Sequence, residues 1–294
     1  MEKNNKNKGF LIVIMILLIG VIAFCAYKLL DIGKGYLDDR KAYTEIVKIS
    51  KIDEGEDVDF KALEKTNDGV KAWIYSPKTI INYPVVKGED NDYYLNHNFS
   101  KDSAACGALF IDKDNNGDFQ DFLTIIYGHR MRDGSMFASL GNYLKQDYYD
   151  KHNYMVLRTK SKAYKLELFA GNIIEGHSEY YDLSRYTNNE VKEAFIKEIV
   201  DNSSFKSDVS VGVNDRIVCL STCTYEIDNG RYVLFGKLSE LDEPEYKEVI
   251  RYEEPSLTES VSDEVLWILV GACAVVLLLL VILIRAMVKK RSRK

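Results

Sequence analysis

Short apolar runs rich in β-branched and aromatic residues recur along the middle of the chain and predict a mainly β domain. Turn-forming residues such as Gly, Asn and Asp separate the runs. Strands are therefore predicted at residues 72–75, 83–86, 107–112, 122–128, 154–159, 163–174, 216–221 and 231–237. About eight short strands with few helices between them are typical of a closed β-barrel.

Apolar residues at helical spacing interrupt this pattern in three places. They predict a helix over residues 33–50 and a short helix around Phe60, capped by Asp57 or Asp59. Between the sixth and seventh strands, Thr187-Asn188-Asn189-Glu190 fits a capping box, in which side-chain oxygens accept from the free N–H groups of a helix start. The predicted fold is therefore a β-barrel with N-terminal helices and one inserted helix.

Two uncharged stretches, residues 10–27 and 265–284, flank the predicted domain. A helix needs about 20 apolar residues to cross the hydrocarbon core of a membrane. Basic residues precede the first stretch and follow the second, so the positive-inside rule predicts two transmembrane helices, at 10–30 and 264–285, with both termini in the cytoplasm. A cleaved signal peptide is the alternative for the first stretch, although no good cleavage site follows it.

The predicted spans divide the chain into regions of different charge. Residues 1–30 carry a net charge of +3, residues 263–294 carry +4 and the middle carries −13, which suggests different compartments. The total of −6 argues against a nucleic-acid binder, and five cysteines in 294 residues exclude a disulfide-dense scaffold. Between and beyond the spans, the chain would comprise a cytoplasmic tail (1–9), an extracytoplasmic domain (31–238), an acidic tether (239–263) and a basic cytoplasmic tail (286–294).

Three cysteines, Cys106, Cys219 and Cys223, lie in the predicted extracytoplasmic domain. Because the number is odd, at least one thiol has no partner within the domain. Cys219 and Cys223 share one predicted strand, where four residues separate their Cα atoms by about 13 Å, too far for a disulfide. A bridge from Cys106 to either one stays open, and the spacing fits an inert buried cysteine as well as a reactive one.

Cys223 stands at the end of its predicted strand, before the turn signal Asn229-Gly230. The hairpin would bring Arg231 back beside Cys223, and a thiol next to a guanidinium suits a nucleophile with an anion-stabilising partner. A thiol nucleophile also needs an acid or base. Of the four histidines, His129 is the one that follows an apolar strand directly, so it is the candidate for this role.

The run Thr124 to Phe137, TIIYGHRMRDGSMF, resembles the histidine motif of class B sortases. Leu220-Ser221-Thr222-Cys223, followed by Arg231 on the next strand, resembles their cysteine motif and arginine. The resemblance extends over about residues 35–240, and the predicted helix between the two motifs is similar to the extra helix of class B.

This resemblance implies a membrane-anchored cysteine transpeptidase or thiol peptidase with an eight-stranded sortase barrel, which attaches surface proteins to the cell wall. Sortases cut exported proteins at a C-terminal sorting signal of LPxTG or NPxTN type. The acyl group passes through a thioacyl-cysteine to a cell-wall or pilin amine. By position, Cys223 would be the nucleophile, His129 the acid and base, and Arg231 the group that holds substrate and stabilises the oxyanion. Ser221 and Thr222 would contact substrate, and no cofactor or metal is implied.

Two features depart from the plain class B pattern. A second membrane span is unusual in class B and is more familiar from pilus-building sortases. Cys219 stands before the LSTC motif, where the family commonly has Thr; it is interpreted as a packing residue. A hydrolytic cysteine peptidase of the same fold and a non-catalytic, membrane-anchored binding module remain as alternatives.

The segment from Asp112 to Asp118 resembles the start of a calcium-binding EF-hand loop. Leu123, however, occupies the twelfth position, where such loops have Glu, and the flanking residues have the pattern of strands. A polar hairpin turn is therefore favoured over a calcium site.

Overall fold

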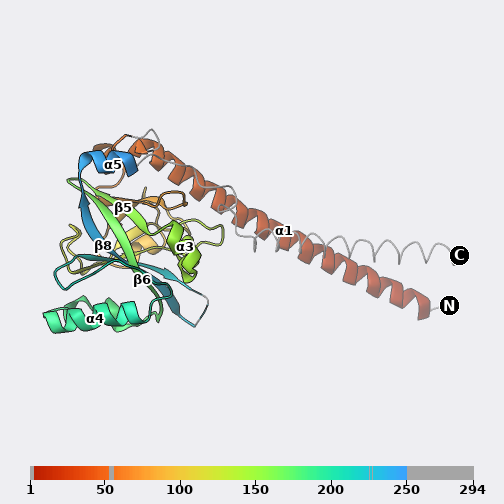
Figure 1. Ribbon diagram of the computed structural model, residues 1–294. Coiled ribbons are helices and arrows are strands. Elements are labelled where there is room, and N and C mark those ends of the chain that lie inside the picture. The colour runs from red at the N-terminus through yellow and green to blue at the C-terminus, as the bar shows by residue number, and fades with distance from the viewer. Residues whose placement is uncertain (1–2, 53–55, 225, 227, 250–294) are drawn as a thin grey trace. The chain divides into compact units, whose positions relative to one another are not determined.

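The computed structural model describes residues 3–52, 56–224, 226 and 228–249. Residues 39–262 form one compact unit, and residues 1–38 belong to another. The strands of the described chain all lie in the unit that begins at Asp39 (Figure 1). This unit contains every residue that the sequence proposes for the site.

The first helix, α1 (Lys3–Ser50), is continuous and joins the two units. It includes the helix predicted over residues 33–50, and it runs from the predicted first span into a charged second half with exposed Lys28, Asp31 and Lys34. In the part of the chain that the structure describes, no helix is both long and apolar enough to cross a membrane. The structure therefore does not support the predicted span at 10–30, and the one at 264–285 lies outside the described residues.

Eight strands close into a barrel in the spatial order β1-β2-β3-β4-β7-β8-β6-β5, which confirms the predicted fold class. Most neighbours are antiparallel, whereas β2 with β3 and β4 with β7 are parallel. All eight predicted strands are present, with bounds shifted by a few residues. The strands are β1 (Val70–Tyr75), β2 (Asn82–Lys87), β3 (Leu109–Ile111), β4 (Leu123–Tyr127), β5 (Tyr154–Thr159), β6 (Ala163–Glu175), β7 (Ile217–Cys223) and β8 (Gly230–Leu241).

Alternate residues of β4, β7 and β8 belong to two separate apolar cores. Ile126, Val218 and Leu220 join a large cluster with residues from the rest of the barrel. Ile125 and Cys219 join a second cluster with side chains of the inserted helix. Because successive side chains of a strand point to opposite faces, each strand is buried on both sides, and a shift of one residue would exchange the two sets.

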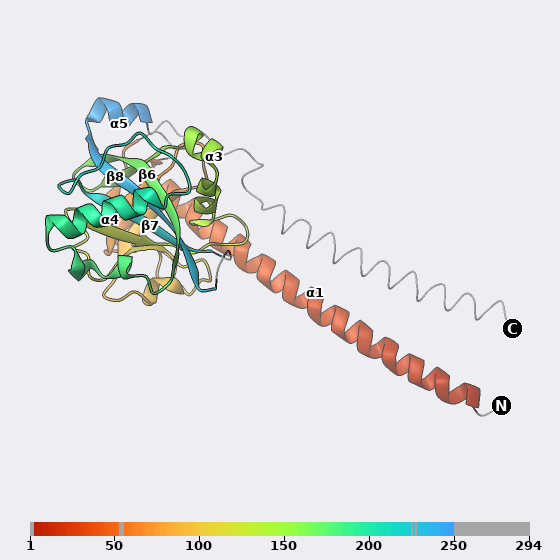
Figure 2. The same ribbon diagram turned by 60° about the horizontal axis from the view of Figure 1, so that its bottom comes forward.

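The inserted helix, α4 (Asn189–Asp201), covers the outer face of the β7–β8 region (Figure 2). It buries Phe195, Ile196 and Ile199, which lie on one face of the helix at helical spacing. The capping residue is Asn188, whose Oδ1 accepts from the Val191 N–H at 2.9 Å, so the helix starts one residue later than the capping box predicts. An Asn side chain caps a helix as well as Thr does, which explains the shift.

Other short helices connect the strands. The helix predicted near Phe60 is α2 (Phe60–Thr66), and Asp59 caps it by accepting from the Ala62 N–H. The remaining segments are α3 (Gln146–Lys151), α5 (Glu243–Val249) and the 3-10 turns η2 (Tyr93–Leu95), η3 (Ala138–Leu144), η4 (Glu179–Tyr181) and η5 (Leu183–Arg185).

The beginning of the predicted acidic tether is regular structure. β8 continues to Leu241 and α5 follows, with Tyr246 only 1% exposed. Tyr246 packs under the guanidinium of Arg158 on β5, whose Nε and Nη2 donate to the two carboxylate oxygens of Asp57. This cluster ties the segment before α2 and the helix after β8 to the same point of the barrel. Residues 250–263 of the predicted tether lie outside the described residues.

We expect the Asp57–Arg158 pair to make stability depend on pH. Burial acts to raise the pKa of Asp57, but the hydrogen bonds and charge of Arg158 outweigh it and leave the pKa below its ordinary value. A lowered pKa stabilises the fold above the unfolded-state pKa of about 4, and this contribution disappears as the pH falls through the folded-state pKa. Asp57→Asn should therefore lower the thermal unfolding midpoint of the full chain at pH 7 and change it little near pH 2.

The matched control for this experiment is Glu248→Gln, which removes an exposed carboxylate from α5. It should leave the midpoint unchanged at both pH values. An equal loss of stability in Asp57→Asn at pH 7 and at about pH 2 would contradict an electrostatic origin.

Candidate active site

Three neighbouring strands of the barrel bring the predicted site residues to one end of the sheet. On β7 and β8, Cys223 is the direct antiparallel partner of Arg231, so their Cβ atoms are about 5 Å apart. On the other side of β7, the parallel strand β4 pairs Tyr127 with Ser221, and the Gly128 N–H donates to the Ser221 carbonyl at 3.1 Å. The observed pairing ends there, and His129 follows two residues after the end of β4 at Tyr127, on the strand next to the one that carries Cys223.

Cys223 and Cys219 lie on the same face of β7 but differ in exposure. Cys219 is 2% exposed in the outer core, and burial raises its pKa well above the ordinary value of a thiol. Cys223 is partly exposed at the strand end. Since the thiolate is the reactive form of cysteine, Cys219 is suited to packing, as its predicted role states, and Cys223 to chemistry.

The disulfide that the sequence leaves open for Cys106 does not form. Cys106, Cys219 and Cys223 are all free thiols. Cys106 is buried, and burial together with the charge of Asp39 raises its pKa. Cys223 is therefore the one of these three domain cysteines that reaches solvent.

His129 is half-buried and is held by the backbone. Its Nε2 lies 2.7 Å from the carbonyl oxygen of Leu95 at the end of η2. A carbonyl oxygen only accepts, so Nε2 carries the proton, and Nδ1 of the neutral ring is the free base. Gly107 makes room for this ring, because a Cβ at that residue would lie 3.2 Å from His129 Cδ2 and its φ of +57° is unfavourable for other residues.

Arg231 is half-buried next to the predicted hairpin turn. Asn229 has a φ of +52°, a left-handed conformation that Asn tolerates better than most residues. The Arg231 Nη1 donates to the Gly230 carbonyl at 3.0 Å, so the guanidinium folds back over its own turn. Its remaining N–H groups give it donors for an anionic group near Cys223.

Ser221 and Thr222 are both 2% exposed, which limits direct contact with a substrate in this conformation. Ser221 Oγ is 2.8 Å from the Tyr181 hydroxyl, and it faces the same side of β7 as Cys223. Thr222 faces the opposite side, and its Oγ1 has no hydrogen-bond partner among the described residues. Ser221 and Thr222 therefore lie on opposite faces of β7, and Ser221 is the one that shares a face with Cys223.

Two tyrosines that the sequence pattern does not single out lie beside the site. Tyr127 precedes His129 by two residues, and its ring centroid is 5.8 Å from that of Tyr181 on η4. Burial is the main cause that raises the pKa of Tyr181, and the charges of Arg231 and Cys223 also act on it. Tyr127 lies within the run that resembles the histidine motif, at the end of β4, whereas Tyr181 has no sequence signal.

The loop that resembles an EF-hand start is a turn closed by its own hydrogen bonds. Asp112 Oδ1 accepts from the Asp114 N–H at 2.8 Å. Asp121 accepts from the backbone of Asn116 and from the side chains of Asn115 and Asn116. The carboxylates therefore hold the connection between β3 and β4 in a fixed shape.

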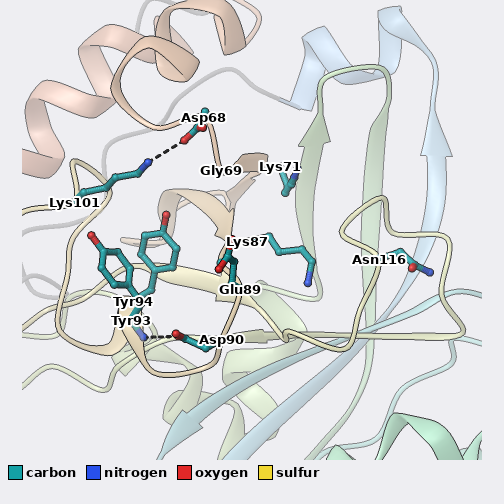
Figure 3. A pocket seen from close by; sticks show the side chains of 11 residues that line it. Asp68, Gly69, Lys71, Lys87, Glu89, Asp90, Tyr93, Tyr94, Lys101 and Asn116 are labelled. Carbon is teal, nitrogen blue, oxygen red and sulfur yellow. Dashed lines mark hydrogen bonds and ion pairs between the residues drawn. The ribbon is translucent and has the colours of Figure 1, made fainter.

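A separate pocket of about 590 Å³ lies around Lys71, Lys87 and Tyr93 (Figure 3). It includes none of the three predicted catalytic residues. Its charges are mixed: Lys101 pairs with Asp68 at 2.9 Å, and Lys87 Nζ donates to two loop carbonyls. The pocket is connected to the site along the backbone: Tyr94 lines the pocket, and the carbonyl of the next residue, Leu95, contacts His129 Nε2.

Comparison with known proteins identifies the family of this chain. A family model described as the Sortase domain matches residues 74–239. Sortase B of Listeria monocytogenes is 36% identical over 206 residues, 69% of this chain and 83% of that protein. Sortase B of Staphylococcus aureus is 32% identical over 243 residues, 79% and 98% of the two chains. A solved Staphylococcus aureus sortase B–substrate complex matches with a TM-score of 0.64 at 31% identity, covering 70% of this chain and 100% of that one. The chain therefore belongs to the sortase family and is a relative of the class B enzymes.

Proposed function

We propose that this sortase cleaves a C-terminal sorting signal of LPxTG or NPxTN type through Cys223 and transfers the acyl group to a cell-wall or pilin amine. The observation that carries the proposal is the position of Cys223, a partly exposed thiol directly opposite Arg231 on β8 and on the strand next to β4, whose end leads to His129. The family supports a cysteine transpeptidase in general, and one solved relative is a sortase B–substrate complex.

In the first half of the proposed reaction, the Cys223 thiolate attacks the carbonyl carbon of the scissile peptide bond. A C–S bond forms, and the negative charge moves to the carbonyl oxygen, where the Arg231 guanidinium donates to it. The C–N bond then breaks. Protonated His129 gives its proton to the leaving amine, which leaves a thioester on Cys223 and a neutral imidazole.

In the second half, the acceptor amine attacks the thioester carbonyl. Neutral His129 takes the proton from the amine, a new C–N bond forms and the C–S bond breaks to release the thiolate. His129 thus acts once as acid and once as base, and an imidazole ring can do both because it can donate and accept a proton. The Leu95 carbonyl fixes Nε2 as the donor, so Nδ1 is the nitrogen that exchanges the proton.

Cys223→Ala should abolish cleavage of quenched LPxTG- and NPxTN-type peptides, because no other group forms the thioester. Arg231→Lys should lower kcat by about 10²–10³, since an ammonium keeps the charge but not the planar fork of donors. Steady-state fluorescence measures both effects. Cys219→Ala, on the same strand, is the matched control and should retain cleavage.

Full activity in Cys223→Ala would contradict the proposal. A wild-type chain that cleaves no peptide and whose Cys223 does not react with a thiol probe would favour the non-catalytic binding module.

A transpeptidase should also form a ligated product when an amine is supplied. With a short glycine peptide as acceptor, mass spectrometry should detect the acyl group joined to the glycine amine, and the free acid should decrease as acceptor is added. The N-acetylated peptide, which has no free amine, is the control. Hydrolysis alone, at every acceptor concentration, would identify a hydrolytic peptidase of the same fold instead.

We also propose that residues 10–30 and 264–285 hold the catalytic domain at the outer face of a membrane. The support is the uncharged sequence of both stretches with basic flanks, and the exposure of large apolar side chains along α1, such as Phe24 and Leu30 at 62% and 75%. In cells, the full chain should stay in the membrane fraction after alkaline extraction, and external protease should reach the domain. Release by alkaline extraction would contradict this attachment.

A further inference from the structure

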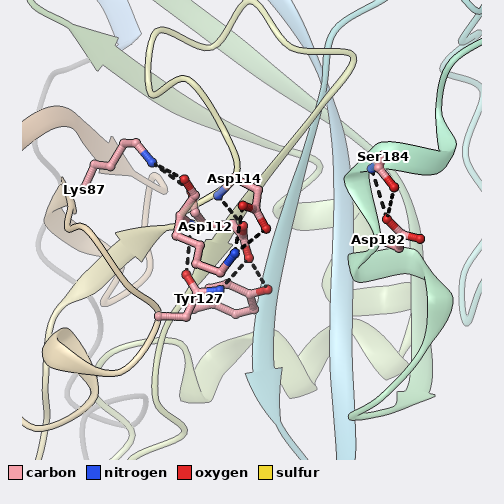
Figure 4. Close-up of polar contacts among 8 residues, drawn as sticks. Lys87, Asp112, Asp114, Tyr127, Asp182 and Ser184 are labelled. Carbon is pink, nitrogen blue, oxygen red and sulfur yellow. Dashed lines mark hydrogen bonds and ion pairs between the residues drawn. The ribbon is translucent and has the colours of Figure 1, made fainter.

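The carboxylate of Asp112 is buried next to the site and forms no ion pair with a side-chain cation in the described chain. Asp112 is 3% exposed and follows β3 directly. Its Oδ2 accepts from the Tyr127 hydroxyl at 2.8 Å and from Asn91 Nδ2 at 2.9 Å, and its Oδ1 accepts from the Asp114 N–H (Figure 4). Burying a charge is costly unless hydrogen bonds satisfy it, so three donors at this position point to a specific role.

Tyr127 is the donor that connects Asp112 to the site. Burial, followed by the charge of Asp112, raises the pKa of Tyr127 well above its ordinary value, so its hydroxyl keeps its proton and donates. The ring lies between two others, with centroids 5.3 Å from Phe110 and 5.8 Å from Tyr181. Asp112 therefore fixes the hydroxyl of a ring that is already packed against two aromatic neighbours.

Tyr181 connects Tyr127 to β7, the strand that carries Cys223. Its hydroxyl is 2.8 Å from Ser221 Oγ, and Ser221 lies two residues before Cys223 on the same face of β7. Tyr127 and Ser221 are also direct partners in the parallel register. Two routes, one through the backbone and one through the aromatic rings, thus connect Tyr127 to the end of β7.

We infer that Asp112 is a positioning residue for the transpeptidase reaction, acting through the Tyr127 hydroxyl and the Tyr181 ring on the end of β7 that carries Cys223. This inference rests on the proposed function. The hydrogen bonds of the Asp112 carboxylate go to Tyr127, Asn91 and Asp114, and none goes to Cys223. Its effect is geometric, because small displacements of a nucleophile lower the rate steeply, by up to about 10²-fold for 1 Å.

The test is a double-mutant cycle between Asp112→Asn and Tyr127→Phe in the full chain. A carboxylate has two acceptor oxygens, whereas an amide has one. In Asp112→Asn, the side chain therefore cannot accept from the Tyr127 hydroxyl with one oxygen and from the Asp114 N–H with another. Each single variant should lower kcat by about 10-fold with a smaller change in KM. The double variant should be no slower than the slower single variant, because both changes break the same link.

Asp114→Asn is the matched control, since it alters the next carboxylate of the same loop, which is exposed and pairs with Lys113. It should leave kcat unchanged. Unchanged kcat in Asp112→Asn, an equal loss in Asp114→Asn, or losses that multiply in the double variant would each overturn the inference. Thermal unfolding of each variant, with assays well below the midpoints, keeps a loss of folded protein separate from a loss of rate.

Alkylation of Cys223 by iodoacetamide separates this inference from the proposed function. Its rate, followed against pH by mass spectrometry, needs no substrate. If no peptide is cleaved, the proposed function fails, but Asp112→Asn should still change the alkylation rate several-fold while Asp114→Asn does not. An unchanged alkylation profile in Asp112→Asn, in an enzyme that loses all cleavage on Cys223→Ala, would overturn the positioning role alone.

Discussion

The site depends on the register between β4 and β7. These two strands are parallel, separated by about ninety residues of chain, and pair in step from Leu123 with Ile217 to Tyr127 with Ser221. Apolar residues on both faces of both strands hold this register, because a slip of one residue would move each buried side chain to the wrong core. The same register brings the end of β4, which leads to His129, beside the last residues of β7, which include Cys223.

Packing on both faces of β7 also explains why Cys223 is partly exposed to solvent whereas Cys219 is buried. Cys219 and Cys223 share a face, but that face is buried at Cys219 and Ser221, next to α4 and the turn η4, and is partly exposed at Cys223. The inserted helix thus buries one thiol and leaves the other at the open end of the strand. The replacement of the usual Thr by Cys219 is tolerated because a buried thiol behaves as a small apolar group.

The strands and the inserted helix could be predicted because each leaves a local signal, such as alternation or a capping residue. The catalytic roles of Cys223, His129 and Arg231 stay predictions, based on strand-end positions and on the motif. The regular structure after Ser239 was missed because its composition is acidic, although Pro244 in the first turn of α5 is a typical helix start. The roles of Tyr181 and Asp112 have no local signal, since they arise from contacts between η4, β4 and the loop after β3. Burial of Ser221 and Thr222 likewise depends on tertiary packing, so their resemblance to the motif could not predict it.

The partner of His129 has a consequence for the two directions of proton transfer. Many catalytic histidines are oriented by a carboxylate, which favours the charged imidazolium. In the described chain the Leu95 carbonyl takes this place, and it fixes the tautomer with a neutral dipole. The proposed thioester mechanism uses the charged ring for the leaving amine and the neutral ring for the incoming one, and a carbonyl oxygen can accept from Nε2 in both forms. Asp112, the buried carboxylate of the loop after β3, accepts from the Tyr127 hydroxyl. This hydrogen bond fixes the hydroxyl of a ring that packs against Tyr181.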